Sequence, residues 1–394
     1  MITKRQLFFH HLAQTSPEPP AFEFIGADGA YLIDQNGRKF FDLISGISVS
    51  SLGHQNVQIK DAIHKQVDKH LHLMVYGEFI IQAQIELVDT LVKLLPDCLS
   101  SVYLTNSGTE ATEGAMKLAK RYTGRTDFVS FTNSYHGSTQ GALSLSGSDF
   151  LKDGYRPLLP GCKHIDYNSF EQLSAIDQHT AAVFIEYVQA ESGVQLPSPG
   201  FLKTVRDRCH ETGALLIADE IQTGMGRTGK LFAFEHENIV PDVLLLGKGF
   251  GAGMPLAAFI SSTEIMKVLT HDPVLGHLTT FGGHPVSCAA ASAGFDFILK
   301  SNLLSNIAEK EKLFHQLLQH PKIKAFRSSG LLMALEFENE TINRQIISQC
   351  FKNSLVTDWF LFAPDCLRLA PPLTITMDEI REICNLLIQS LNEV

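Results

Sequence analysis

The polar stretch TNSGTEAT at 105–112 follows an apolar run and has the residues of an anion-binding turn. Ser107 and Glu110 have the spacing of a helix capping box. The N–H groups of Gly108 and Thr109, with the Thr109 hydroxyl, would form a cradle at the positive end of a helix, where a phosphate fits. An ordinary helix cap is the alternative, and this stretch alone favours it.

Two carboxylates, Asp219 and Glu220, end the apolar run of ALLIADEIQTG. A strand that ends in this way brings a carboxylate to the edge of a sheet, where it needs a cation. The protonated ring nitrogen of a pyridine cofactor would serve, because holding that proton makes the ring an electron sink for a carbanion. Gln222 could then donate to a ring hydroxyl. Taken alone, such a pair of acids is more often a loop or cap feature.

A lysine lies between two glycines in LLLGKGFGAGMP. The glycines remove steric bulk around the Lys248 amine, which would have to attack, and be attacked at, a planar imine. Desolvation at such a position lowers the pKa of a lysine toward the range where the free amine is available. A lysine that snorkels out of a strand end is the alternative, and only the combination with the first two groups favours chemistry.

Alternating strands and helices must position these groups. Apolar runs of strand length alternate with amphipathic stretches, which predicts an α/β domain with a mainly parallel sheet, and sites in such sheets lie at the carboxyl ends of the strands. We expect a large domain over 46–285, a smaller α+β domain over 286–394 and a segment over 1–45 that contributes to the smaller one. Strands are expected in SSVYLTNSG, DFVSFTN, AAVFIEYV, GALLIADE and DVLLLGK.

Composition excludes several classes of protein. The 394 residues carry a formal charge of -10 with 44% hydrophobic residues, so no basic surface is expected for nucleic acid. The seven cysteines stand singly, which fits neither a metal site nor a disulfide framework, and no apolar run approaches a membrane span. We therefore expect a cytoplasmic protein with no metal, nucleic-acid or membrane partner.

Two nucleotide-binding motifs are approximated but incomplete. The segment GKGFGA at 247–252 fits the loose dinucleotide fingerprint, but Pro255 interrupts the helix that should begin there. The segment GMGRTGK at 224–230 resembles a P-loop, yet Leu231 stands where a serine or threonine must bind magnesium. Neither segment predicts a nucleotide site.

The phosphate cradle, the aspartate and the lysine follow one another in this order on one domain. With these groups, the chain resembles the class III, fold type I aminotransferases that use pyridoxal 5'-phosphate. The resemblance covers nearly the whole length. Its motifs are DQNGRKFFDLISGISVSSLGH at 34, TNSGTEA at 105, YHG at 135, IEYVQAESGV at 185, ADEIQTGMGRTG at 218, LGKGFGAGMPL at 246, TTFGGHP at 279 and RLAPPL at 368.

The resemblance implies a role for each motif. Lys248 would form the Schiff base with the cofactor and carry the proton, and Asp219 would pair with the pyridine nitrogen. The other residues implied in cofactor binding are Ser107, Gly108 and Thr109 at the phosphate, Tyr135 stacked on the ring, with its neighbour His136, Gln222 near the ring oxygen, and Thr280 reaching the phosphate of the neighbouring subunit in the family's homodimer. For Tyr135, a core aromatic is the alternative.

The implied reaction is a ping-pong transamination from an amino donor to a 2-oxo acid. Arg368 resembles the family arginine that binds the α-carboxylate, and Glu191 occupies the position of the glutamate that masks it while an ω-amine donor is bound. A surface arginine on an alternating strand is the alternative. Acetylornithine and ornithine are examples of such a donor, and 4-aminobutyrate, lysine, diamines and β-amino acids remain open.

Two departures bear on the substrate. Ser138 stands where many relatives carry an arginine for a second carboxylate, and Ile47 stands where ornithine aminotransferases can place a tyrosine. An aminomutase or a decarboxylase on the same fold is the alternative function, and a noncatalytic metabolite-binding protein would lack a competent lysine.

Overall fold

The computed structural model describes residues 2–394, and its strands form three sheets. The largest sheet has seven strands in the order β4-β10-β9-β8-β7-β5-β6. Its five neighbouring strands from β9 to β6 are parallel, and β10 is antiparallel to both β9 and β4. This arrangement confirms the predicted mainly parallel sheet. The strands are β4 (Ser101–Thr105), β5 (Asp127–Phe131), β6 (Cys162–Ile165), β7 (Thr180–Ile185), β8 (Leu215–Asp219), β9 (Val243–Leu246) and β10 (Ala257–Ser261).

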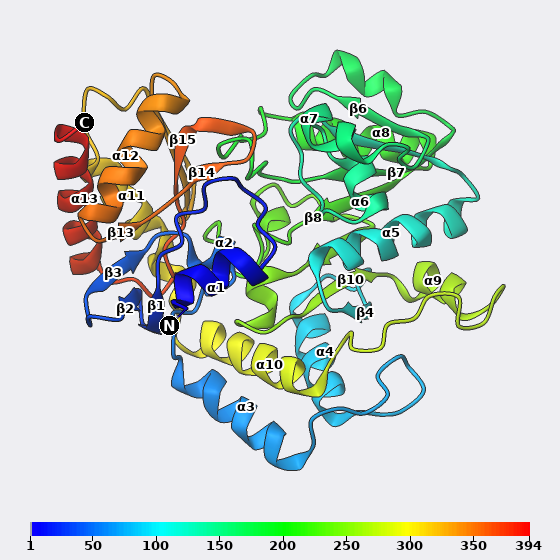
Figure 1. Cartoon of the computed structure of the whole chain (residues 1–394). Helices are drawn as coiled ribbons and strands as arrows, with labels where there is room; N and C mark the ends of the chain where they lie inside the picture. The colour runs from blue at the N-terminus through cyan, green and yellow to red at the C-terminus, as the bar shows by residue number, and fades with distance from the viewer. Residues whose placement is uncertain (1) are drawn as a thin grey trace.

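The central strands are buried on both faces, which is why they read as continuous apolar runs rather than alternating ones. Helices cover the sheet (Figure 1). Helix α5 (Gly108–Thr123) lies close to β10, where a Cβ added at Gly114 would come within 2.3 Å of the Phe259 ring. The other helices of this region are α6 (Gln140–Leu145), α7 (Asp149–Lys152), α8 (Phe201–Thr212) and α9 (Thr263–Met266).

Two four-stranded sheets belong to the other side of the molecule (Figure 1). One has the order β1-β2-β3-β13 and the other the order β11-β12-β15-β14. Their strands are β1 (Phe24–Asp28), β2 (Tyr31–Asp34), β3 (Lys39–Asp42), β11 (Ala325–Ser329), β12 (Leu332–Glu336), β13 (Leu355–Val356), β14 (Trp359–Phe360) and β15 (Ala363–Leu369). Because β13 pairs with β3, the N-terminal strands share a sheet with the C-terminal part of the chain.

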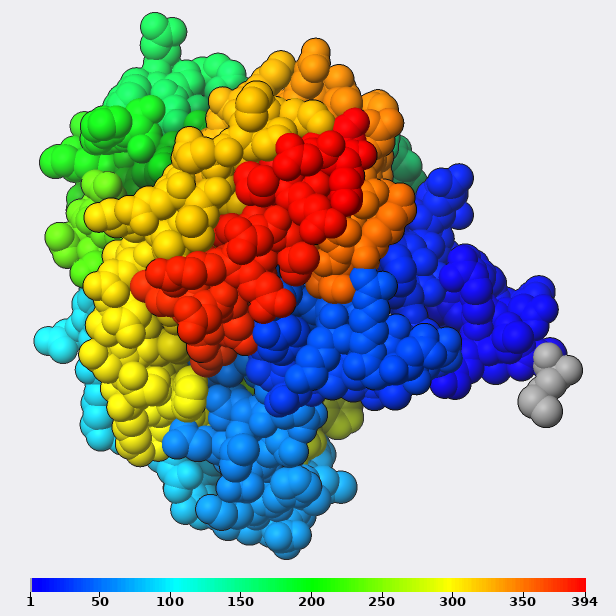
Figure 2. All heavy atoms as spheres, turned by 90° about the vertical axis from the view of Figure 1, so that its left-hand side faces the viewer, coloured from blue at the N-terminus to red at the C-terminus, as the bar shows by residue number. Residues whose placement is uncertain are grey.

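The remaining helices lie on this side and along the bottom of the view in Figure 1. They are α1 (Lys4–His11), α2 (Ser45–Ser48), α3 (Val57–Lys69), α4 (Gln82–Leu94), α10 (Pro285–Lys300), α11 (Ile307–Leu317), α12 (Glu340–Lys352) and α13 (Met377–Asn392). Figure 2 shows α13 (red) on the surface, and it packs against α11 and α12. Helix α10 packs against α3 and α4. The domain boundaries at 45/46 and 285/286 stay a prediction.

The segment at 224–230 that resembles a P-loop contains the buried Arg227. Its Nη1 donates to the carbonyl oxygens of Leu331 at 3.1 Å and Pro371 at 2.6 Å, and its Nη2 donates to Ser51 Oγ at 2.8 Å. Burial lowers the pKa of Arg227 to about 9. The segment thus ties the turn after β8 to the C-terminal part of the chain.

Helices α10 and α11 are separate, and Asn302 has a left-handed φ of 53° between them. Within residues 2–394, no helix is long and apolar enough to cross a bilayer, and no three acidic, histidine or cysteine side chains are grouped as a metal site would need.

Candidate active site

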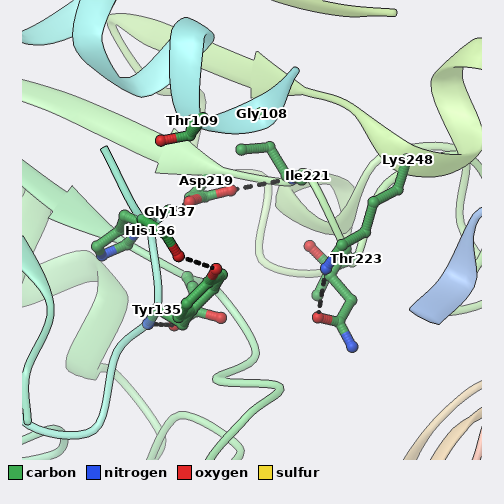
Figure 3. A pocket seen from close by; sticks show the side chains of 12 residues that line it. Gly108, Thr109, Tyr135, His136, Gly137, Asp219, Ile221, Thr223 and Lys248 are labelled. Carbon is green, nitrogen blue, oxygen red and sulfur yellow. Dashed lines mark hydrogen bonds and ion pairs between the residues drawn. The ribbon is translucent and has the colours of Figure 1, made fainter. Parts of the chain in front are cut away.

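A cavity of about 300 Å³ lies where α5 begins and where β8 and β9 end (Figure 3). It is the position that parallel sheets favour, because their strands all end at the same edge. Seven of the residues predicted at the site line it, namely Gly108, Thr109, Tyr135, His136, Asp219, Gln222 and Lys248. Ser107, Glu191, Thr280 and Arg368 do not.

The first turn of α5 leaves its backbone open to the cavity. A Cβ at Gly108 would lie 2.8 Å from Ile221 Cδ1, and a Cβ at Gly137 would lie 2.3 Å from Thr109 Oγ1, so both glycines allow close packing. The Ser107 hydroxyl accepts the N–H of Glu110 at 3.4 Å and therefore caps the helix. The expected capping box is half formed, because Glu110 Oε2 accepts the N–H of Asn106 instead of Ser107.

The two neighbouring carboxylates have different surroundings. Asp219 lines the cavity, and its Oδ2 lies 2.7 Å from Nδ1 of the buried His136. Its Oδ1 accepts the N–H of Ile221 at 3.0 Å. Glu220 turns away and accepts the N–H groups of Ala233 and Phe234, while burial raises the pKa of Glu220 to about 8. Asp219 is therefore the carboxylate that a bound molecule would meet.

Lys248 follows β9 in a turn with a left-handed φ of 47°. Its Nζ donates to Gln222 Oε1 at 2.8 Å. Desolvation by burial lowers the pKa of Lys248, Glu191 raises it and Arg368 lowers it. Close packing explains the glycine that follows Lys248, since a Cβ at Gly249 would lie 3.3 Å from the Ser48 carbonyl oxygen.

Four lining residues were not assigned a role from the sequence: Gly137, Glu186, Ile221 and Thr223. Burial, followed by the charge of Asp219, raises the pKa of Glu186 well above its ordinary value. Its Oε2 accepts the N–H of Tyr135 at 3.4 Å. Glu186 lies directly after β7, so its place at a strand end was the available signal. Ser138, noted as a departure, shares a hydrogen bond with the Tyr135 hydroxyl at 2.9 Å.

Arg368 and Glu191 form a buried bidentate pair, with Nη1 to Oε1 at 2.9 Å and Nη2 to Oε2 at 3.0 Å. Burial alone would raise the pKa of Glu191, but the charge and hydrogen bonds of Arg368 outweigh it and lower the pKa to about 2. The alternative of a surface arginine is thereby wrong, because Arg368 is 2% exposed. Asp358 was not indicated by any sequence pattern, and its Oδ1 accepts the Nε–H of Arg368 at 2.8 Å.

Thr280 lines a different hollow, together with Asn106, Glu110 and Thr279. It lies outside the cavity of Lys248, as a residue that acts on a neighbouring subunit would. Its role toward a second chain stays a prediction.

Comparison with known proteins gives a family match over nearly the whole chain. Residues 14–391 match the family model described as aminotransferase class-III. An ornithine aminotransferase from Toxoplasma gondii ME49 is 29% identical, with a TM-score of 0.91 over 99% of this chain and 96% of that chain. A transaminase from the marine bacterium Virgibacillus is 24% identical, with a TM-score of 0.92 over 98% and 97%. An amine transaminase from an uncultivated Pseudomonas species, in a PLP-bound form, is 25% identical, with a TM-score of 0.89 over 98% of each chain.

Proposed function

The chain belongs to the class III aminotransferases, which depend on pyridoxal 5'-phosphate, and we propose that it moves the terminal (ω) amino group of an amino acid to a 2-oxo acid. Acetylornithine and ornithine are the proposed examples of the donor. The observation that carries this proposal is the closed Arg368–Glu191 pair, which masks the carboxylate-binding arginine of a site that otherwise has its lysine and aspartate in place.

The cavity fits the cofactor. Three buried polar atoms of its lining residues have no hydrogen-bond partner among residues 2–394, namely His136 Nε2, Gln222 Nε2 and Thr223 Oγ1. The N–H groups at the start of α5 suit a phosphate, and Asp219 suits a protonated ring nitrogen. Ser107 would cap the helix end beside the phosphate. The residues that would hold the cofactor are Gly108, Thr109, Tyr135, His136, Asp219, Gln222 and Lys248.

When bound, pyridoxal 5'-phosphate supplies an aldehyde that reacts with amines and a protonated ring that delocalises negative charge from the adjacent carbon. Asp219 holds the proton at the ring nitrogen, and His136 holds the Asp219 carboxylate through its 2.7 Å contact. Lys248, whose pKa is lowered by burial, accepts and returns a proton at the substrate carbon. Gln222 places the Lys248 amine by its 2.8 Å hydrogen bond.

Glu191 and Arg368 allow one site to accept two kinds of substrate in turn. While Glu191 neutralises Arg368, a donor enters with its terminal amine toward Lys248 and meets no exposed cation at this arginine. When Glu191 moves aside, the guanidinium binds the α-carboxylate of a 2-oxo acid in bidentate geometry. Such an exchange would suit a ping-pong order of substrates.

We propose further that the enzyme is a homodimer in which Thr280 reaches the cofactor phosphate of the neighbouring subunit. Support comes from the separation of Thr280 from the cavity of its own chain. Phe281, the next residue in the chain, is a large apolar side chain that is 54% exposed.

A test of the function compares amino-donor consumption with and without a 2-oxo acid. Acetylornithine, ornithine, 4-aminobutyrate, lysine and β-alanine are each supplied with pyruvate or 2-oxoglutarate, and the new amino acid is quantified. We expect sustained consumption only when the 2-oxo acid is present. Sustained donor turnover without any 2-oxo acid would instead identify an aminomutase or a decarboxylase.

Lys248→Ala is the matched loss-of-function variant. Because it removes the group that transfers the proton, we expect kcat to fall roughly 100- to 10,000-fold. Lys230→Ala, in the neighbouring segment but outside the cavity, serves as the control. Wild-type turnover in the Lys248→Ala protein would contradict the assignment.

A further inference from the structure

We propose that Asp358 is a positioning residue that keeps the Arg368 guanidinium in place while Glu191 and the 2-oxo acid carboxylate exchange on it. The inference rests on the proposed function and deepens it, because it adds a residue to the acceptor half of the reaction. It starts from the way in which the nitrogen atoms of Arg368 are divided among their partners.

Two separate edges of the guanidinium are bound by two different carboxylates. The edge with Nη1 and Nη2 faces Glu191, at 2.9 and 3.0 Å. The Nε donates to Asp358 Oδ1 at 2.8 Å. A substrate carboxylate that binds in bidentate geometry takes the place of Glu191, and the Nε bond can persist throughout the exchange.

Asp358 is attached to the strand that carries Arg368. The backbone N–H of Arg368 donates to the Asp358 carbonyl oxygen at 2.9 Å, and the neighbouring Thr357 hydroxyl donates to the Arg368 carbonyl oxygen at 2.5 Å. Asp358 and Arg368 are therefore linked through their backbones as well as through their side chains. Glu191 lies in the turn after β7 of the seven-stranded sheet. Arg368 lies on β15 of a four-stranded sheet, so the ion pair links the two sheets.

The face of the guanidinium is supported as well. Its Cζ lies 4.4 Å from the centroid of the Phe360 ring, and Nη2 also donates to the Trp359 carbonyl oxygen at 3.2 Å. One short segment, Asp358–Phe360, therefore contacts Arg368 at its Nε and at one face of its guanidinium. Only the edge toward Glu191 is left for exchange.

Asp358 also compensates the charge of Arg368. With Glu191 moved away, Asp358 still balances the buried guanidinium, so Arg368 is never left as an uncompensated charge in the protein interior. Lys248 is the other cation whose charge acts in this region, and Asp42 and Glu191 are the other acids that act on Asp358. Asp358 alone among these acids bonds Nε.

The test measures the two half-reactions of the holoenzyme separately. Single-turnover changes in the visible absorbance of the bound cofactor give the maximal rate and the half-saturating concentration for the amino donor and for 2-oxoglutarate. For Asp358→Ala we expect the half-saturating concentration of 2-oxoglutarate to rise roughly tenfold, since a hydrogen bond to a charged group is lost, while both constants of the donor half-reaction change less than about threefold.

Asp358→Asn separates the hydrogen bond from the charge. Asparagine keeps an oxygen that can accept Nε, so we expect it to restore most of the 2-oxoglutarate affinity. Asp365→Ala is the matched control, because Asp365 lies three residues from Arg368 on β15 and contacts Cys366 rather than the guanidinium. Equal losses in both half-reactions, or an Asn variant as impaired as the Ala variant, would overturn the positioning role.

A binding measurement keeps this inference separate from the function itself. The holoenzyme is first converted by the amino donor to the form that accepts a 2-oxo acid. Calorimetric titration of this form with propionate reports on carboxylate binding without turnover, and we expect the binding to be weakened in Asp358→Ala and retained in Asp365→Ala. If the wild type shows no turnover that depends on a 2-oxo acid, the proposed function fails. If turnover is normal but Asp358→Ala binds propionate as the wild type does, this inference alone fails.

Discussion

At the scale of single residues, chemically similar groups acquire different tasks from their surroundings. Asp219 and Glu220 are adjacent, yet one faces the cavity and the other accepts two backbone N–H groups inside the protein. The direction of each side chain follows from the alternation of faces along the end of β8. The type of residue therefore predicts a carboxylate at the site, and the strand geometry selects which one.

The lowered pKa of Glu191 predicts how the protein responds to acid. Its pKa falls from the ordinary value of 4.5 to about 2 in the folded chain, so the carboxylate contributes stability that is complete above pH 4.5 and is lost as the pH falls toward 2. The contribution is on the order of 3 kcal/mol. Glu191→Gln should lower the free energy of unfolding at pH 7, and its difference from the wild type should shrink below pH 4.5.

Urea unfolding of both proteins between pH 7 and pH 3 measures this difference. Glu211→Gln is the control, because Glu211 pairs with Arg208 at the surface and should change the unfolding free energy little at any pH. A difference between Glu191→Gln and the wild type that stays constant from pH 7 to pH 3 would show that Glu191 has no lowered pKa.

At the scale of elements, the site depends on how closely the start of α5 approaches the loop that carries YHG. The approach requires Gly137, which has a φ of 131° and whose added Cβ would lie 2.3 Å from Thr109 Oγ1. The Thr109 hydroxyl also lies 2.7 Å from Thr139 Oγ1, which in turn donates to Glu113 at 2.6 Å. The proposed phosphate cradle would thus be built jointly by the helix and the loop.

Gly137→Ala should therefore weaken cofactor binding. We expect the dissociation constant of pyridoxal 5'-phosphate to rise about tenfold or more, because the strain and overpacking of such a change typically cost about 1–3 kcal/mol. Equilibrium dialysis measures the binding. Gly154→Ala is the control, since its Cβ would meet no atom within 4 Å. Equal affinities for the two variants would show that the cradle tolerates a wider spacing.

A second element carries strain beside the lysine. All four residues of α2 have positive φ values, between 51° and 64°, and three of them are not glycine. Asp42 Oδ1 holds the segment by accepting the N–H groups of Ile44 and Ser45, and its Oδ2 bonds His54. This explains why Asp42 and His54 frame the motif that contains SGIS.

At the scale of the whole molecule, a second chain would complete the site. We expect light scattering to give twice the mass of one chain, and Thr280→Ala to weaken cofactor binding about tenfold through the loss of a hydrogen bond to a charged group. Thr270→Ala is the control, because its hydroxyl already donates to the Lys267 carbonyl oxygen. A monomer that binds the cofactor with full affinity, unaffected by Thr280→Ala, would exclude the shared site.

The sequence by itself determined the family, the α/β class and the order of the groups along the chain. It could do so because strand ends with small or charged residues, such as those at Asp219 and Lys248, leave local patterns in the chain. Strand β10 was not among the expected strands, and its antiparallel place between β4 and β9 depends on pairing between distant segments.

The tertiary structure decided further contacts that no motif predicted. It brought His136 to Asp219, Gln222 to Lys248, and Asp358 to the Nε of Arg368. The contact between Glu191 and Arg368, which the resemblance implied, spans 177 positions of the chain, and only the fold shows its geometry. The physical reason is that hydrogen bonds and ion pairs depend on distance in space, which local residue patterns do not encode.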